Sequence, residues 1–199
     1  MINYIFWIAS IIIIALFLCC TVLAVYLIIL LIYSKGLKIS PTVSSTPNSM
    51  KAISKYIREY ILQTTKNNIR ILDIGSGYGT LLFKISKDLE DIKDKEIKLV
   101  GYEISNFAYK ISKSKNKCQN VELINDDINN LNDFNFDLVI TFILAKQQKL
   151  FLDIYRKFPA GTTIIANSLP IPFEENDNFQ LIKTIKVGFR WNVYIYKKL

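Results

Sequence analysis

The chain has 199 residues, a formal net charge of +8, three cysteines and no histidine. The absence of histidine excludes Ser-His-Asp and Cys-His nucleophilic catalysis, and it also excludes His-based metal sites. Cys19 and Cys20 are adjacent and Cys118 stands alone, so the sequence predicts no disulfide framework. Because it contains no Cys-x-x-Cys pair either, we expect no metal ion.

Residues 1–34 contain no charged side chain, and residues 4–33 form a nearly continuous apolar run. About 20 apolar residues cross a bilayer core of roughly 30 Å, so residues 1–34 are predicted to be one transmembrane helix. The basic start and the cleavage site of a secretory signal peptide are missing. Lys35, Lys38 and Lys51 follow the span, and no Lys or Arg precedes it. The positive-inside rule therefore predicts a single-pass membrane protein whose remaining chain faces the cytoplasm or the equivalent organelle interior.

All 25 Lys and Arg residues and all 17 Asp and Glu residues lie after the predicted span. Their positive excess has two interpretations, attraction to an anionic inner leaflet or a Lys-rich surface that aids solubility. Residues 35–48 are rich in Ser, Thr and Pro and have the composition of a linker. Residues 49–199 have a length that suits one folded domain.

The linker ends in Thr46-Pro47, a pair typical of the N-cap and the first position of a helix. Apolar residues then recur with helical spacing, at Met50, Ile53, Ile57 and Ile61. A helix is therefore predicted between this pair and the polar Asn67-Asn68.

Short apolar runs alternate with helical patterns beyond residue 68. Strands are predicted at residues 69–74, 97–102, 121–124, 136–141 and 162–166. The helical patterns between them carry Leu82, Ile85 and Leu89, then Phe107, Ala108 and Ile111, then Leu150, Ile154 and Phe158. Strands separated by helices indicate an α/β fold with a mostly parallel sheet. Two β-rich runs, 179–187 and 191–196, follow with Gly188 between them and predict an antiparallel hairpin at the sheet edge.

A glycine-rich loop follows the first predicted strand, in the sequence Asp73-Ile74-Gly75-Ser76-Gly77-Tyr78-Gly79-Thr80. Glycines let the backbone turn tightly and approach a ligand, and the next helix begins with unpaired N–H groups. A dinucleotide-binding loop has Gly or Ala three residues after its second glycine, where this chain has Thr80. Asp73 beside the loop also disfavours a pyrophosphate and favours a cationic ligand.

The pattern acid-x-Gly-x-Gly-x-Gly resembles motif I of the class I S-adenosylmethionine-dependent methyltransferases. The resemblance implies a Rossmann-like fold with S-adenosyl-L-methionine as cofactor, held by Asp73, Gly75, Ser76, Gly77 and Gly79. It further implies that Glu103, which ends the second strand, holds the ribose hydroxyls. An acid after the third strand would contact the adenine amino group, with Asp127 preferred and Asp126 as the second choice.

Each of these residues also has a purely structural interpretation. The glycines could form only a tight strand-to-helix turn, Glu103 could be a solvent-facing strand end, and Asp126-Asp127 could be a capping pair. The three features follow three successive strands in the order that the family requires, which favours a shared cofactor site. No residue is assigned a catalytic role.

The residues after the fourth strand are informative about the methyl acceptor. Methyltransferases that act on adenine or on glutamine amides resemble one another in an Asn/Asp-Pro-Pro-aromatic motif there, whereas this chain has Thr141-Phe142-Ile143-Leu144. We therefore expect no nucleic-acid partner.

The whole chain resembles the membrane-anchored lysine methyltransferases related to the ATP synthase c-subunit lysine N-methyltransferase. The shared features are the single span, Thr46-Pro47, Gly101-Tyr102-Glu103, Leu169-Pro170-Ile171-Pro172 and the aromatic last strand. The resemblance implies a lysine on a protein as acceptor, with membrane proteins as candidates, because the anchor raises their effective concentration. Two alternatives stay open: methylation of a membrane lipid or quinone, and a non-catalytic cofactor-binding module.

Overall fold

The computed structural model describes residues 2–36, 45–143, 147–189 and 191–199. The chain divides into two units, Met1–Ser40 and Pro41–Leu199. The first unit contains helix α1 (Ile2–Gly36), in which Ser10–Ile28 is long and apolar enough to cross a membrane, with a mean hydropathy of 3.1. The membrane orientation stays a prediction, and Lys38, which contributed to it, lies outside the described residues. The domain boundaries after residues 34 and 48 likewise stay predictions.

Helix α2 (Pro47–Gln63) opens the second unit as its sequence predicts. Thr46 is the N-cap, and its side chain accepts a hydrogen bond from the backbone N–H of Ser49 at 3.2 Å. Pro47 occupies the first turn, where its missing N–H costs no helical hydrogen bond. The apolar side chains Ile53, Ile57 and Ile61 are fully buried, so this face fixes α2 on the sheet.

Within the described residues, the sheet has seven strands in the order β3-β2-β1-β4-β5-β7-β6. The strands are β1 (Asn68–Ile74), β2 (Glu96–Tyr102), β3 (Val121–Ile124), β4 (Leu138–Thr141), β5 (Thr163–Asn167), β6 (Phe179–Lys186) and β7 (Asn192–Lys198). The first five are parallel, whereas β7 pairs antiparallel with both β5 and β6. The predicted Rossmann-like fold, a parallel sheet finished by an antiparallel hairpin, is confirmed.

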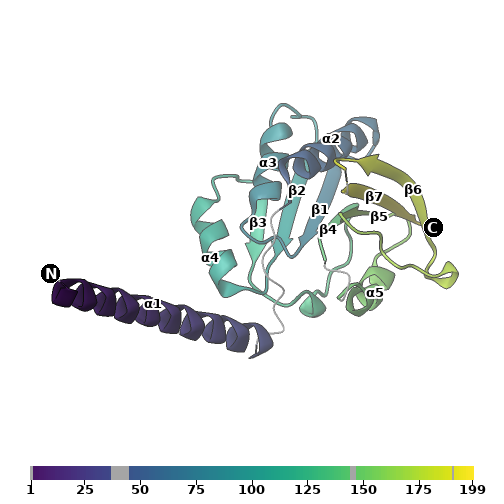
Figure 1. Cartoon of the computed structure of the whole chain (residues 1–199). Helices are drawn as coiled ribbons and strands as arrows, with labels where there is room; N and C mark the ends of the chain where they lie inside the picture. The colour runs from purple at the N-terminus through teal and green to yellow at the C-terminus, as the bar shows by residue number, and fades with distance from the viewer. Residues whose placement is uncertain (1, 37–44, 144–146, 190) are drawn as a thin grey trace. The chain divides into compact units, whose positions relative to one another are not determined.

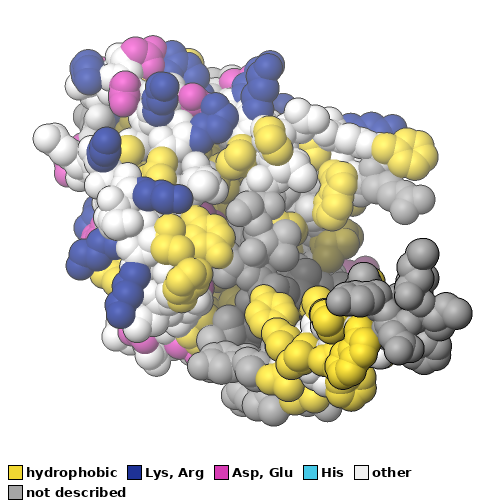
Figure 2. Space-filling view, turned by 60° about the vertical axis from the view of Figure 1, so that its left-hand side comes forward, with side chains coloured by type: hydrophobic (Ala, Val, Ile, Leu, Met, Phe, Trp, Pro, Cys, Tyr) yellow, Lys and Arg dark blue, Asp and Glu magenta, His cyan; other side chains and the backbone are white. Residues whose placement is uncertain are grey.

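Helices cover both faces of this sheet (Figure 1). The remaining helices are α3 (Thr80–Asp88), α4 (Asn106–Lys115), α5 (Gln148–Lys157) and the short η1 (Ile128–Asn130) and η2 (Glu175–Asp177). One core cluster joins α2 and α3 to alternate strand residues such as Ile71, and the other joins α5 to the opposite residues such as Leu72. Figure 2 shows Lys and Arg side chains spread over the surface of the second unit, with hydrophobic side chains between them.

Two details differ from the sequence patterns. The fourth strand begins at Leu138 instead of residue 136, because Phe136 lies in the preceding turn and packs edge-on against Phe158. Phe107 and Leu150 belong to the predicted helices but are 70% and 71% exposed, so they do not contribute to the core.

Candidate cofactor site

The glycine loop makes a sharp turn between β1 and α3. Gly75, Gly77 and Gly79 have φ values of 74°, 56° and 73°, a left-handed conformation that glycine adopts without steric cost. The backbone N–H groups of Gly75 and Ser76 both donate to the carbonyl oxygen of Tyr102 at 2.9 Å, which ties the loop to the end of β2. The position of the loop therefore depends on backbone hydrogen bonds to β2 and depends little on which side chains the loop carries.

Gly101 on β2 makes room for this loop. A Cβ added at Gly101 would lie 2.8 Å from Ser76 Oγ and 2.7 Å from Leu82 Cδ1. A side chain at residue 101 would therefore push Ser76 or the start of α3 away from the strand. This packing gives a physical reason for glycine in Gly101-Tyr102-Glu103.

Glu103 holds the loop from the side of β2. Its side chain is buried, and Oε2 accepts a hydrogen bond from the Gly77 N–H at 2.8 Å. Its Oε1 accepts from the Ser105 N–H at 2.7 Å, just before α4 begins. A carboxylate has about four acceptor positions, so both oxygens can still accept hydroxyl donors. The predicted ribose contact of Glu103 stays a prediction.

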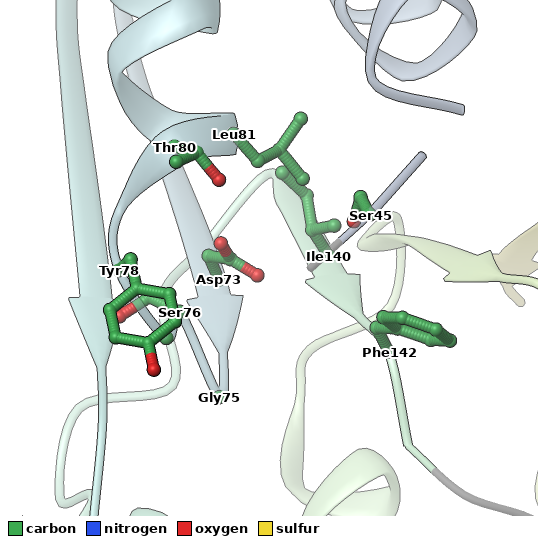
Figure 3. A pocket seen from close by; sticks show the side chains of 10 residues that line it. Ser45, Asp73, Gly75, Ser76, Tyr78, Thr80, Leu81, Ile140 and Phe142 are labelled. Carbon is green, nitrogen blue, oxygen red and sulfur yellow. The ribbon is translucent and has the colours of Figure 1, made fainter. Parts of the chain in front are cut away.

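Asp73 lies at the centre of the pocket beside the loop (Figure 3). Figure 3 shows its carboxylate with Ile140 and Phe142 on one side and Tyr78 on the other. The side chain is buried, and no described residue donates a hydrogen bond to it. Burial, followed by the negative charge of Glu103, raises the pKa of Asp73 to about 7. An ionised carboxylate here would be stabilised by a positively charged ligand.

Residues 65–182 match the model of a family described as a methyltransferase domain. The chain belongs to this family. No curated protein matches the sequence in a direct comparison.

Solved structures share the methyltransferase fold at low sequence identity. An RNA methyltransferase from Salinibacter ruber, crystallised with S-adenosyl-L-homocysteine, has a TM-score of 0.59 and 17% identity, covering 78% of this chain and 94% of its own. Magnesium protoporphyrin IX methyltransferase from Synechocystis, with bound cofactor, has a TM-score of 0.56 and 12% identity. The match covers 76% of this chain and 80% of the Synechocystis chain. A methyltransferase from Aquifex aeolicus has a TM-score of 0.53 and 16% identity, and the match covers 78% of this chain and 100% of the Aquifex chain. The protein is thus a class I methyltransferase with S-adenosyl-L-methionine as its cofactor.

The pocket of this methyltransferase suits a cationic, N–H-bearing ligand. Asp73 offers a buried carboxylate, and Ser76 Oγ is buried with no hydrogen-bond partner among the described residues. In addition, no described side chain caps the N-terminus of α3 after Gly79, so its first N–H groups are open to a carboxylate. The amino-acid part of S-adenosyl-L-methionine carries an ammonium, which Asp73 would hold, and a carboxylate, which the N–H groups at the start of α3 would hold.

Three of the four other predicted residues of the glycine loop line this pocket, and the fourth does not. Gly75, Ser76 and Gly77 line it, whereas Gly79 is the N-cap of α3 and packs under the ring of Phe83. Because a Cβ at Gly79 would lie 2.6 Å from Phe83 Cζ, glycine is needed there for packing as well as for backbone conformation.

Asp126 and Asp127 form hydrogen bonds within their own turn. Asp127 is the N-cap of η1, and its Oδ1 accepts from the Asn129 N–H at 2.9 Å. Asp126 Oδ1 accepts from the Asp127 N–H and from Asn130 Nδ2, both at 2.7 Å. Both carboxylates therefore have the capping contacts that the structural interpretation expects, while their contact with adenine stays a prediction.

Two residues near the site were missed by sequence reasoning. Ser45 lines the cofactor pocket, and its Oγ accepts a hydrogen bond at 2.8 Å from Nδ2 of Asn167, which ends β5. Asn167 Oδ1 is buried with no hydrogen-bond partner in the described part of the chain. The residues are 122 positions apart, so no local pattern could have joined them. Only the position of Asn167 at the carboxyl end of a predicted strand could have drawn attention to it.

Proposed function

We propose that this protein N-methylates a lysine side chain of a membrane-associated protein. The sequence resemblance to the anchored lysine methyltransferases and the apolar helix α1 support a target at the membrane. A nitrogen acceptor is supported by a single structural observation, the unpaired buried oxygen of Asn167. This is the observation on which the proposal depends.

Asn167 lies on the same face of the sheet as Asp73. Strand side chains alternate between faces, and Asn167 follows two residues after Ile165, which shares a core cluster with Ile71 and Ile140. The strand order places β4 between β1 and β5, and the register aligns Asp73 with Ile165. Asn167 is therefore two strand spacings and two residues away from Asp73, a separation of about 12 Å. The Asn167 side chain reaches the cofactor pocket through its hydrogen bond to Ser45, and Asn167 itself lines a second cavity together with Thr141 and Tyr155.

An amide oxygen that is buried without a donor is costly, and an amine or ammonium N–H would satisfy it. The cofactor supplies a methyl group on a positively charged sulfur, which an amine lone pair can attack once the lysine has lost its proton. Apolar Ile140 and Phe142 beside the pocket favour the neutral form of that amine, because desolvation lowers the pKa of a lysine. Asn167 would orient the amine without removing its proton.

A labelling experiment tests the acceptor class. Membranes from cells lacking the protein are incubated with the purified full chain and cofactor labelled in its methyl group. We expect label in a protein band that yields methyl-lysine after hydrolysis, and much less label with the Glu103→Ala variant at a limiting cofactor concentration. Label confined to extracted lipid or quinone would move the assignment to that acceptor class. Binding of S-adenosyl-L-homocysteine without any transfer would support the non-catalytic module.

Asn167→Ala tests the acceptor contact directly. Loss of a hydrogen bond to a charged or ionisable partner costs roughly 1.5–3 kcal/mol, so kcat/KM for the labelled protein should fall by about 10-fold to 100-fold. Affinity for S-adenosyl-L-homocysteine should not change, because that ligand lacks the acceptor. Asn116→Ala at the end of α4 is the matched control. An equal fall in cofactor affinity would instead place Asn167 in the cofactor site.

A further inference from the structure

The turn between β6 and β7 exposes aromatic side chains. We name residues 187–189 and 191 the aromatic turn, in which Phe189 is 92% and Trp191 46% exposed. The backbone N–H of Val187 donates to the Trp191 carbonyl oxygen at 3.0 Å and closes the turn. Lys186 precedes it and is exposed, and residues 178–199 contain no Asp or Glu. Aromatic rings flanked by lysine are typical of segments that lie at a membrane–water interface.

The aromatic turn adjoins the point where the linker enters the second unit. Trp191 is followed by Asn192, whose carbonyl oxygen accepts a hydrogen bond from the Ser168 N–H at 2.9 Å. The preceding residue, Asn167, donates its side-chain hydrogen bond to Ser45 at 2.8 Å. Ser45, the first described residue after residues 37–44, is thus joined to the aromatic turn by two hydrogen bonds and two peptide links.

The linker is too short to carry this region far from the membrane. Eight residues, 37–44, separate Gly36 from Ser45. An extended chain spans at most about 3.3–3.6 Å per residue, so Ser45 lies within about 30 Å of the end of α1. This limit follows from the number of residues alone. It applies to the membrane surface if α1 spans the bilayer, so the inference depends on the membrane anchor of the proposed function.

We propose that the aromatic turn docks into the lipid–water interface of the membrane that holds α1. Docking would turn the carboxyl edge of the sheet, with the cofactor pocket, toward the lipid surface. Ile104 and Phe107 follow the carboxyl end of β2 on the same edge and are 50% and 70% exposed. They offer a second, separate apolar contact, because β1, β4 and β5 lie between β2 and β7. Anionic lipids strengthen the contact through Lys186. Acceptor lysines close to the membrane surface are then the ones presented to the site.

Tryptophan fluorescence tests this docking in the full chain. The sequence contains two tryptophans, Trp7 in α1 and Trp191 in the aromatic turn, so Trp7→Phe leaves Trp191 as the reporter. The variant is reconstituted into vesicles of neutral and anionic phospholipid that carry a nitroxide near the headgroup or deep in the acyl chain. We expect roughly a twofold loss of Trp191 emission with the shallow nitroxide and less with the deep one, because indole rings settle at headgroup level.

Trp191→Phe is the matched control, since its remaining Trp7 reports on α1. If the nitroxides quench Trp7 in the Trp191→Phe variant but do not quench Trp191 in the Trp7→Phe variant, α1 is anchored and the docking proposal is wrong. Unquenched Trp7 would show that α1 is outside the bilayer, and both the anchor and the docking would fail. Phe189→Ser in the Trp7→Phe background should reduce the shallow quenching of Trp191. Unchanged binding of S-adenosyl-L-homocysteine by that variant shows that the fold is intact.

Discussion

The two halves of the sheet's carboxyl edge are built by different means. On the side of β1 and β2, left-handed glycines and backbone N–H groups set the shape of the loop, and Glu103 fixes it from β2. On the side of β4 and β5, this edge carries Phe142, which lines the cofactor pocket, and the buried Asn167. The first half, which we call the cofactor half, is thus shaped mainly by backbone geometry. The second, which we call the acceptor half after its proposed role, is shaped by side chains.

Both halves contain a buried oxygen group without a described partner, but the two groups differ in charge. Asp73 can ionise, whereas the amide of Asn167 is always neutral. Burial raises the pKa of Asp73 to about 7, so near neutral pH the empty site holds a costly negative charge. The cofactor half should therefore lower the stability of the ligand-free protein in a pH-dependent way, and the acceptor half should not.

The largest effect is expected for Asp73→Asn. Burial raises the pKa of Asp73 from its ordinary value of 3.8 to about 7 in the folded protein, and a pKa change of one is worth about 1.4 kcal/mol. The stabilising contribution of a raised pKa is complete below pH 3.8 and is lost as pH rises through 7. At pH 8 the ligand-free variant should therefore be more stable than the wild type, by up to about 4 kcal/mol, in urea unfolding. The difference should vanish toward pH 4.

The same variant should bind S-adenosyl-L-homocysteine more weakly, because the ligand's ammonium loses a charged partner. Asp94→Asn, on an exposed bend, is the control and should change neither property. A ligand-free Asp73→Asn protein that is less stable than the wild type at pH 8 would show that the Asp73 charge is stabilised by the protein itself.

A second, smaller effect is expected at Glu103, where one carboxylate accepts two backbone N–H groups. Glu103→Ala removes charge-assisted bonds worth roughly 1.5–3 kcal/mol, so affinity for S-adenosyl-L-homocysteine should fall by about 10-fold to 100-fold in calorimetry. The affinity of Glu103→Gln should lie between those of the wild type and Glu103→Ala. Gly77 and Ser105 donate to different carboxylate oxygens, and in glutamine one of these positions is an NH2 group that cannot accept. Glu96→Ala, at the opposite end of β2, should bind normally. Unchanged affinity in Glu103→Ala would remove Glu103 from the site.

The sequence predicted the cofactor half better than the acceptor half for a physical reason. Apolar strands and a glycine-rich turn are local patterns, so Asp73, the loop and the hairpin could be placed without coordinates. The hydrogen bond between Ser45 and Asn167 joins residues 122 positions apart, and it arises only when β5 packs beside β4. Phe107 shows a related limit, because helical spacing alone did not indicate that this apolar residue is exposed.

The smallest effect is expected at Asp126 and Asp127, where capping and cofactor contact can be separated. Loss of an N-cap costs about 0.5–2 kcal/mol, so Asp127→Ala should destabilise the protein by this amount through η1. If Asp127 also contacts the adenine amino group, Asp127→Ser, which keeps a capping oxygen, should restore stability but still bind S-adenosyl-L-homocysteine about 10-fold more weakly. Asp126→Ser serves as the matched variant. If only Asp126→Ser binds S-adenosyl-L-homocysteine more weakly, Asp126 is the adenine contact. If Asp126→Ser and Asp127→Ser both bind normally, the two carboxylates have only the capping role.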